Sequence, residues 1–345
     1  MKNAILAAMF LPAMAQANEP LISLDYFTAS IGVEAVTTTW VPNFFGLPSS
    51  DSAETYEHHL FDLDGALLIG DHFRLSGNFN FVHTDRERLA VGTIRRGSLE
   101  GEVLLPHGFS VGAYAESLCF FDCGESTTHV YGAGLSLGYS SDLVNVKGRF
   151  GTSNRDARVL VGFEEDEVCG VGFNDDCFSV PGEPIFETMG ETGRSASVSA
   201  VFSPTPRTNI AVSGQIHRID LYEVEQKTEI AGLGGSYSFD NGVTVSGAYE
   251  FHHVSYDNRP FLTTQEYALG VGYDFRSRGA NLIVNAEFGQ KHYDFHDVRN
   301  DLDPTNIVRV GITIPLGNKP KTGAVSLLHD IRDPELNGYG RSFLQ

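Results

Sequence analysis

Basic side chains are scarce in this 345-residue chain. It has 24 Lys and Arg residues against 44 Asp and Glu residues, which gives a formal net charge of −20 at pH 7. Proteins bind nucleic acids and anionic membrane surfaces through concentrated positive charge. The composition therefore argues against nucleic acid as a partner.

Long apolar runs are also lacking, and the one at the N-terminus is short. Lys2 is the only charge in the first 18 residues, "AILAAMFLPAMA" is apolar, and "AQA" at 15–17 offers small residues for cleavage. This order predicts a secretory signal peptide over residues 1–17, because a spanning helix needs about 20 apolar residues and Pro12 interrupts the run. Since no later run could span a bilayer as a helix, an exported chain of this kind is either soluble or a β-barrel.

Only four cysteines are present, in two close pairs. "CFFDC" holds Cys119 and Cys123, and "CGVGFNDDC" holds Cys169 and Cys177. In an oxidising compartment this spacing favours two local disulfides. Neither segment contains a histidine, so a metal site is the weaker alternative. The Gly-x-Gly pairs lack a strand–loop–helix context, and we predict neither a cofactor nor a metal.

What the chain does have is a repeated alternation of apolar with small or polar residues. "VTVSGAYEF" puts Val243, Val245, Tyr249 and Phe251 on one face, and "YALGVGYDF" repeats the pattern. Side chains alternate faces along a strand, so each segment is a strand with one apolar and one polar face. The predicted strands are 22–40, 57–69, 73–83, 92–105, 109–119, 128–139, 143–153, 191–202, 208–219, 227–239, 243–255, 263–275, 281–294 and 305–316.

The connections alternate between short and long. Six short turns alternate with longer polar stretches near 41–56, 84–91, 120–127, 153–190, 220–226, 256–262 and 295–304. Aromatic residues flank both kinds of connection, as in the girdles of membrane barrels. The inward face carries charges that a sandwich core could not hold unpaired. We therefore expect an all-β, antiparallel up-and-down transmembrane barrel of 14 strands, with 12 or 16 as alternatives. The "ARVLVGF" segment (157–163) either extends a strand beyond the membrane or forms an extra hairpin with "EPIFETM", which would give 16 strands.

The whole mature chain resembles the Gram-negative outer-membrane β-barrels and is porin-like in size. The last predicted strand contains "RVGITIPL", which fits the family's assembly signal at Arg309, Gly311, Ile314 and Leu316. It departs from the signal in having Leu316 where Phe is most frequent, and in lying inside the chain. The resemblance implies an outer-membrane location, with membrane lipid and the barrel-assembly machinery as partners.

A barrel of this size has a lumen of roughly 10–15 Å, unless something fills it. The loop at about 153–190 is a candidate constriction. The inward charges are predicted to form two opposed walls across a pore. The basic wall comprises Arg74, Arg96, Lys147 and Arg149, and the acidic wall comprises Glu34, Asp62, Asp64, Glu250, Asp274 and Glu287. Glu100, Glu102 and Glu116 lie among the bases, and an ion-paired, partly closed interior is the alternative.

The chain continues past the last strand. We expect residues 1–17 to be the signal peptide, 18–316 the barrel and 317–345 a periplasmic tail. This tail either dangles, binds a periplasmic partner or enters the lumen. Its short apolar piece, Val325 to Ile331, suggests packing against something.

The function expected from these features is passive diffusion of small hydrophilic solutes. A closed structural or surface-assembly barrel that acts through its external loops is the alternative. A third hypothesis is a lipid-face hydrolase using His253 and Ser255, with Gln265 as the orienting group; it lacks the Asn-Gly that follows the serine in barrel phospholipases. We predict that the protein is not an enzyme.

Overall fold

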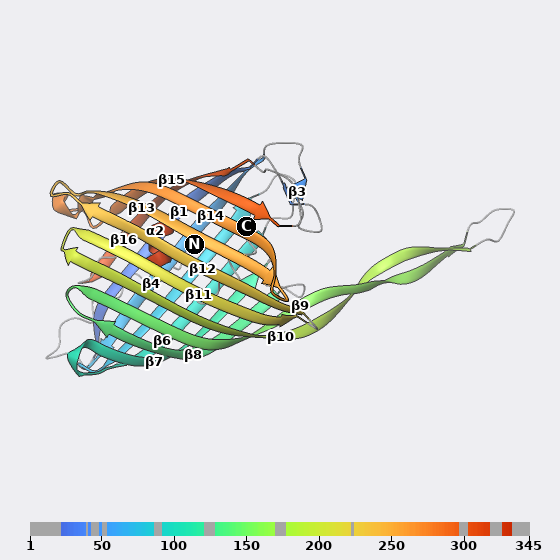
Figure 1. Ribbon diagram of the computed structural model, residues 1–345, viewed down its shortest axis with the longest axis horizontal. Coiled ribbons are helices and arrows are strands. Elements are labelled where there is room, and N and C mark those ends of the chain that lie inside the picture. Colours follow the sequence, from blue (N-terminus) through green and yellow to red (C-terminus); the bar gives the residue numbers. More distant parts are fainter. Residues whose placement is uncertain are drawn as a thin grey trace.

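The computed structural model is a closed barrel of 14 antiparallel strands (Figure 1). It describes residues 22–38, 41–42, 48–49, 54–85, 92–120, 128–169, 177–221, 224–296, 303–317 and 326–332. The barrel strands are β1 Ile22–Thr38, β4 Glu54–Ile69, β5 Phe73–Asp85, β6 Gly92–Leu104, β7 Phe109–Phe120, β8 Thr128–Ser140, β9 Val144–Cys169, β10 Cys177–Thr205, β11 Thr208–Leu221, β12 Val224–Ser238, β13 Val243–Tyr256, β14 Arg259–Asp274, β15 Ile283–Phe295 and β16 Thr305–Gly317. The prediction of 14 strands is confirmed.

The barrel closes between its first and last strands. β1 pairs with β16 from Tyr26↔Gly317 to Thr37↔Asn306, and it pairs with β4 on its other edge. Every other barrel strand pairs with its neighbours in chain order. β16 is thus the closing strand, and the barrel wall itself has no unpaired edge strand. Outside the barrel, β2 (Val41–Pro42) pairs with β3 (Pro48–Ser49).

The alternation in sequence becomes an apolar outer face and a polar inner face. On β14, Leu269 is 73% exposed and its neighbour Ala268 is buried. On β16, Val308 and Val310 are exposed and Arg309 between them is buried. With strands this regular, backbone hydrogen bonds are satisfied within the barrel, as a hydrocarbon environment requires. The outer surface is therefore a band suited to lipid.

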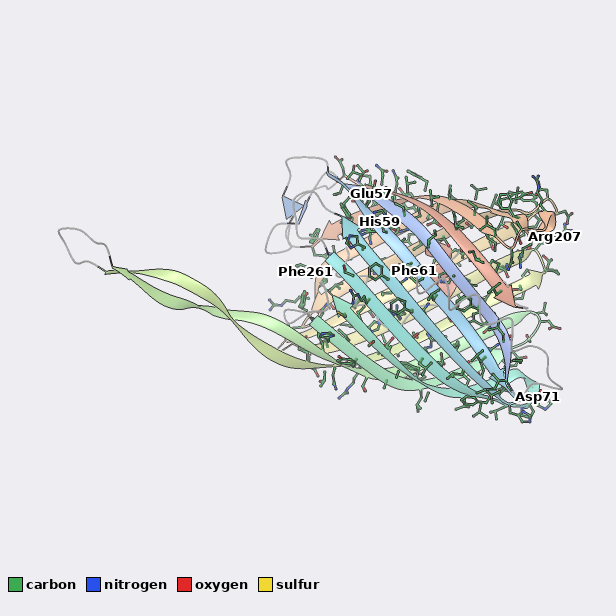
Figure 2. The ribbon with its side chains drawn as sticks, turned by 180° about the vertical axis from the view of Figure 1, so that it is seen from behind. Glu57, His59, Phe61, Asp71, Arg207 and Phe261 are labelled. Atoms are coloured by element: carbon green, nitrogen blue, oxygen red, sulfur yellow. The ribbon has the colours of Figure 1, made fainter. Side chains whose placement is uncertain are left out.

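The short turns gather at one end of the barrel, which we call the short-turn end. Asp71 and Arg207, from two of these turns, both lie there (Figure 2). At Gly242 the turn has φ 88°, which only glycine adopts freely. β1 begins at the short-turn end and β16 ends there, because Tyr26 near the start of β1 pairs with Gly317 at the end of β16.

Two connections at the opposite end are shorter than the sequence suggested. β13 ends at Tyr256 and β14 begins at Arg259, so Asp257 and Asn258 alone form the turn, with φ 48° and 61°. The expected loop at 256–262 is wrong. Likewise β11 and β12 leave only 222–223 between them, where 220–226 was expected as a loop. Polar strand ends beyond the membrane look like loops in sequence, although they remain paired through the backbone.

β9 and β10 continue far past the barrel as a paired hairpin (Figure 1). Residues 157–163 pair with 184–189, from Met189↔Ala157 to Pro184↔Phe163, and Cys177↔Cys169 is the last pair. The two segments extend barrel strands, so the 16-strand alternative is wrong. Because the hairpin projects away from the barrel, it is not the constriction that was considered for 153–190.

One short helix, α2 (Leu327–Arg332), lies inside the barrel (Figure 1). It contacts β10, β11, β12 and β13. None of the helices in the described part of the chain is long and apolar enough to cross a membrane.

Candidate functional site: the barrel interior

A row of small side chains crosses the inner wall from β10 to β15. Adjacent strands pair these positions directly with one another. The row, which we call the small-residue row, is Val201–Ala211–Gly234–Ala248–Ala268–Gly289. The short side chains leave space above this wall that larger residues would fill.

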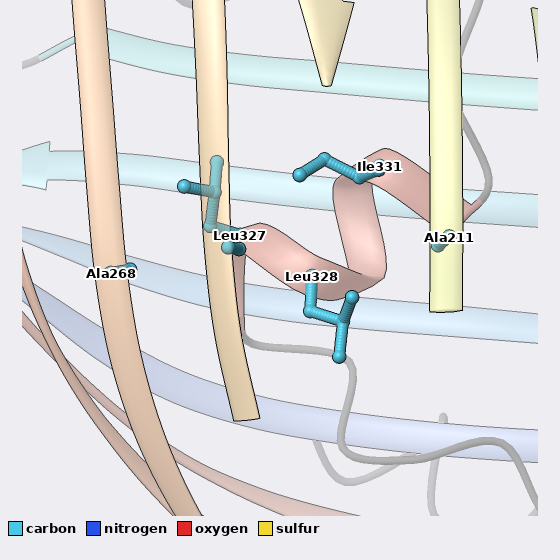
Figure 3. Packing of buried hydrophobic residues seen from close by; sticks show 6 residues of the cluster. Ala211, Ala268, Leu327, Leu328 and Ile331 are labelled. Atoms are coloured by element: carbon cyan, nitrogen blue, oxygen red, sulfur yellow. The ribbon is translucent and has the colours of Figure 1, made fainter. Parts of the chain in front are cut away.

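Helix α2 occupies that space (Figure 3). Its apolar residues Leu327, Leu328 and Ile331 are buried and pack against Ala211, Ala248 and Ala268, with Val201 at the margin. Glycine at the next inward position leaves room for the helix, since a Cβ on Gly234 would lie 2.7 Å from Leu328 Cδ1. Of the three alternatives for the tail, entry into the lumen is therefore observed for residues 326–332. Gly317, the first residue of the predicted tail, is the last residue of β16. Residues 318–325 and 333–345 of the tail, and the expected signal peptide at 1–17, lie outside the described residues.

Polar contacts fix the start of α2. The Leu327 N–H donates to Glu287 Oε1 at 3.1 Å, and the His329 N–H donates to Ser326 Oγ at 3.2 Å. Serine is a favoured residue at this position because its hydroxyl accepts from an N–H that the helix leaves unpaired. The Glu287 carboxylate thus ties the helix to β15.

The net free energy that favours docking of the helix is small. Burial of its three apolar side chains contributes about 1.5–3 kcal/mol each. Ordering of its six residues costs about 1–2 kcal/mol per residue, and so short a helix is not stable alone in water. The favourable and unfavourable totals are similar, so docking depends on the fit to the small-residue row and on the contact with Glu287.

Arg309 is the centre of an ion cluster on the wall beside α2. Its register partners on the two neighbouring strands are Glu34 and Glu287. Arg309 Nη1 lies 2.8 Å from Glu287 Oε1, Nη2 lies 2.6 Å from Glu266 Oε1, and Nε donates to Glu34. Lys291 Nζ lies 3.7 Å from Glu266 Oε2. Buried charges of this kind require such pairing.

Two histidines extend this cluster. His252 Nε2 lies 2.6 Å from Glu250 Oε1, and Glu250 is the register partner of Glu266. His58 Nε2 lies 3.9 Å from Glu34 Oε1. Among the residues that the structure describes, no group of three or more His, Cys, Asp or Glu is placed to hold a metal ion.

Glu34, Glu250 and Glu287, which the sequence analysis predicted to line the pore, belong to this cluster, but their partners were not predicted. Arg309 was assigned to the assembly signal, and Glu266 and Lys291 were not singled out. The signal that could have found Arg309 is its position between Val308 and Val310, whose outward direction turns Arg309 inward.

On the wall of β5 to β9, across the barrel from Arg309, the basic side chains lie flat along the inner surface. Lys147 Nζ and Arg149 Nη2 each lie 2.7 Å from Glu100 Oε2, and Lys147 Nζ lies 3.3 Å from Glu102 Oε1. The two bases stand on β9 and the acids on β6, so both side chains cross β7 and β8. Glycine permits this close packing: a Cβ on Gly112 would lie 2.9 Å from Glu102 Cγ.

The remaining predicted charges are paired as well. Arg96 Nη2 lies 3.7 Å from Glu116 Oε2, and Arg74 donates to Asp25. Asp62 accepts from Asn78 at 2.9 Å, and Asp64 accepts from Tyr26 at 3.1 Å. The ion-paired interior thus describes these contacts better than two unpaired, opposed walls. Whether the predicted residues line a conducting path stays a prediction.

Asp274 is the last residue of β14 and lies at the rim of the barrel. The sequence analysis had predicted it on the pore wall. It accepts from the backbone N–H of Arg276 and from Arg276 Nε, both at 2.9 Å. The hydrogen bonds to Asp274 raise the pKa of the Arg276 guanidinium above its ordinary value. The pair closes the turn Phe275–Arg278 between β14 and β15.

The geometry does not favour a hydrolase. His253 Nδ1 lies 3.0 Å from Thr263 Oγ1, and a register shift separates Val254 from Ser255. Ser255 is buried, and none of the contacts described joins it to His253. Gln265 accepts from Tyr249 at 3.3 Å.

The cysteine pairings and the assembly signal stay predictions. Cys169 and Cys177 are directly opposed in the β9–β10 ladder, which is the backbone arrangement that a local bridge needs. Cys119 lies on β7, and Cys123 is outside the described residues. "RVGITIPL" lies in the closing strand, where the family places its signal.

No family model and no curated protein matches the chain. Among solved structures, it is similar to the loop L8 deletion mutant of OmpT, an outer membrane protein of Vibrio cholerae, with 12% identity over 86% of this chain and 100% of that chain and a TM-score of 0.49. It is also similar to the CymD monoaromatic hydrocarbon channel (10% identity, 86% and 90% covered, TM-score 0.48) and to a FadL homologue of Pseudomonas aeruginosa (11%, 84% and 90%, 0.47).

Matches at such low identity and TM-score carry no conclusion about substrate or activity. The molecule's own architecture identifies its class. Its 14 strands close into a barrel, its outer face is a band of exposed apolar side chains, and its polar groups face inward. These features are those of a membrane-spanning β-barrel of 14 strands.

Proposed function

We propose that this barrel is a passive diffusion channel for small hydrophilic solutes, with no enzymatic activity. The observation that carries the proposal is that inward-facing charged side chains remain partly exposed inside a closed wall. The side chains of Arg74, Lys147 and Arg149 are 26%, 24% and 19% exposed. Water therefore has access to the interior along β5 to β9, and a solute that can replace that water can follow the same path.

Helix α2 limits the size of these solutes. A barrel of 14 strands encloses roughly 10–15 Å, and a helix with its side chains is about 10 Å across. With α2 on the wall of β10 to β14, the remaining path is narrow and runs beside the opposite wall. We infer that the channel admits inorganic ions and only the smallest organic solutes, and excludes larger ones.

A liposome-swelling series tests this function. The purified protein is reconstituted, and swelling is followed with uncharged sugars from a triose to a trisaccharide. We expect rapid swelling with the smallest sugar and a steep decline over the series. Swelling no faster than in protein-free vesicles, with the barrel folded, would contradict the channel function.

The long β9–β10 hairpin favours a second candidate function, a barrel that acts through its external parts. A paired hairpin projecting so far from the membrane is not needed to enclose a pore. In a matched variant, residues 157–189 are replaced by an Asn-Gly turn between Asp156 and Gly190, which are register partners. A channel keeps its swelling rates in this variant. A surface-assembly barrel would instead show no swelling in either form and would lose binding of cell-surface material with the hairpin.

A further inference from the structure

In several ion pairs on the wall of β5 to β9, the basic side chain is more exposed than its acidic partner; in Arg96–Glu116, by contrast, both side chains are buried. The side chains of Lys147 and Arg149 are 24% and 19% exposed, whereas those of their partners Glu100 and Glu102 are 5% and 6% exposed. The same holds for Arg74 and Asp25, at 26% and 7%. In each of these unequally exposed pairs the carboxylate lies against the wall and the basic group faces the water.

These basic groups belong to one continuous patch. Arg74 is the register partner of Glu102, and Ser136 is the register partner of Arg149. Between them, Gly112 pairs with Glu102 on one side and Ser136 on the other. The resulting row crosses five strands, and Lys147 and Arg149 reach back along it to Glu100. We call Arg74, Lys147 and Arg149 the basic patch.

The opposite wall does not offset this patch at the water-accessible surface. Most of its carboxylates are buried: the side chains of Glu250, Glu266 and Glu287 are only 2–6% exposed. Glu34 is 19% exposed, and its carboxylate is bonded to Arg309. They are engaged by Arg309, Lys291 and His252. A solute inside the barrel therefore meets basic groups on one wall and few acidic groups on the other.

The basic patch also keeps hydrogen-bonding capacity. An ammonium group has three N–H donors, and the Lys147 ammonium contacts two carboxylates. A third donor and the remaining exposed surface are available to an anion in the path. Charge-assisted hydrogen bonds to carboxylate or phosphate oxygens are stronger than neutral ones, and they act at short range inside a narrow pore.

We propose that the basic patch makes the channel selective for small hydrophilic anions, carboxylates and phosphate among them. This inference rests on the proposed channel function and adds its charge selectivity. It opposes what the composition suggests, since a formal net charge of −20 would by itself favour cations. The charges inside the pore determine the selectivity, because charges outside it are screened beyond about 10 Å at 0.1 M salt.

The test is the zero-current potential of the protein in planar bilayers under a tenfold KCl gradient. For the wild type we expect chloride to be several-fold more permeant than potassium. The double variant Lys147→Gln/Arg149→Gln should lose that preference or reverse it. The control Arg207→Gln removes a charge from the short-turn end, where Arg207 pairs with Asp240 and both are exposed, and it should keep the wild-type ratio.

A second variant guards against misfolding of the first. Glu100→Gln/Glu102→Gln leaves the bases in place and should raise the preference for chloride. A wild type that prefers potassium, or variants that leave the ratio unchanged, would overturn the inference while the channel function stands. No current from any form would instead refute the channel function, and the inference with it.

Discussion

The side chain of Ile331 on α2 occupies the space that a Cβ on Gly232 of β12 would need. A Cβ placed on Gly232 lies 2.6 Å from Ile331 Cγ1, which is closer than such atoms approach in proteins. The glycine and the helix are therefore fitted to each other, although 99 positions of sequence separate them. Glycine at position 232 of the inner wall is thus one reason why α2 can lie inside the barrel.

Gly232→Val is expected to displace α2 without harming the barrel. Valine suits a strand, but its side chain cannot share space with Ile331. Because the helix is held with little free energy to spare, we expect it to leave the wall and the single-channel conductance to rise severalfold. The measurement is conductance in planar bilayers.

The matched control is Gly214→Val on the neighbouring strand. A Cβ on Gly214 meets Val198 Cγ1 at 3.9 Å, an ordinary contact on the outer face. This variant should conduct as the wild type does. Equal conductance changes in both variants would show that a general strand effect, and not the helix, is responsible.

Arg309→Met is expected to destabilise the barrel strongly. The substitution leaves Glu34, Glu266 and Glu287 without their shared cation. Removal of one partner from a buried ion cluster costs about 3–5 kcal/mol. We expect a clearly lower unfolding temperature, measured by the heat-dependent shift in gel mobility of the folded barrel.

An exposed ion pair offers the comparison. Arg207 and Asp240 pair at the short-turn end with side chains 50% and 78% exposed, and pairs of this kind contribute about 0–1 kcal/mol. Arg207→Met should therefore leave the unfolding temperature nearly unchanged. Similar shifts for Arg309→Met and Arg207→Met would mean that the interior cluster does not stabilise the fold.

The strands were predictable because two independent signals agree along most of the chain. Alternation gives the faces of β13, and the Asp-Asn-Gly turn at 240–242 gives its start. The signals fail where strands leave the membrane. Arg259 and Pro260 begin β14, yet no apolar face is required of them there, so they read as loop.

The interior was less predictable because alternation fixes only the direction of a side chain. Which groups meet depends on the register between strands. The bonds of Arg309 to Glu287 and Glu34 follow from the pairing of β16 with β15 and β1, and the packing of α2 requires Ala211, Gly234 and Ala248 to align. Neither alignment can be read from a single strand.

The tip of the β9–β10 hairpin is expected to carry a disulfide between Cys169 and Cys177. Their Cα atoms are directly paired, and a bridge across a loop of this length restricts the unfolded hairpin by about 2–3 kcal/mol. Peptide mapping by mass spectrometry, without reduction, should find the two cysteines in one linked pair and Cys119 linked to Cys123. Linkage between the two segments, or alkylation of all four cysteines before reduction, would contradict this.

The most direct test of a pore occupied by its own C-terminal helix is the single-channel conductance of Leu328→Glu/Ile331→Glu beside the wild type. The two carboxylates cannot pack on the small-residue row, so α2 should remain in water and leave the wall of β10 to β14 uncovered. The account predicts a small conductance for the wild type and a severalfold larger one for the variant, with both proteins folded. Equal conductances would contradict it.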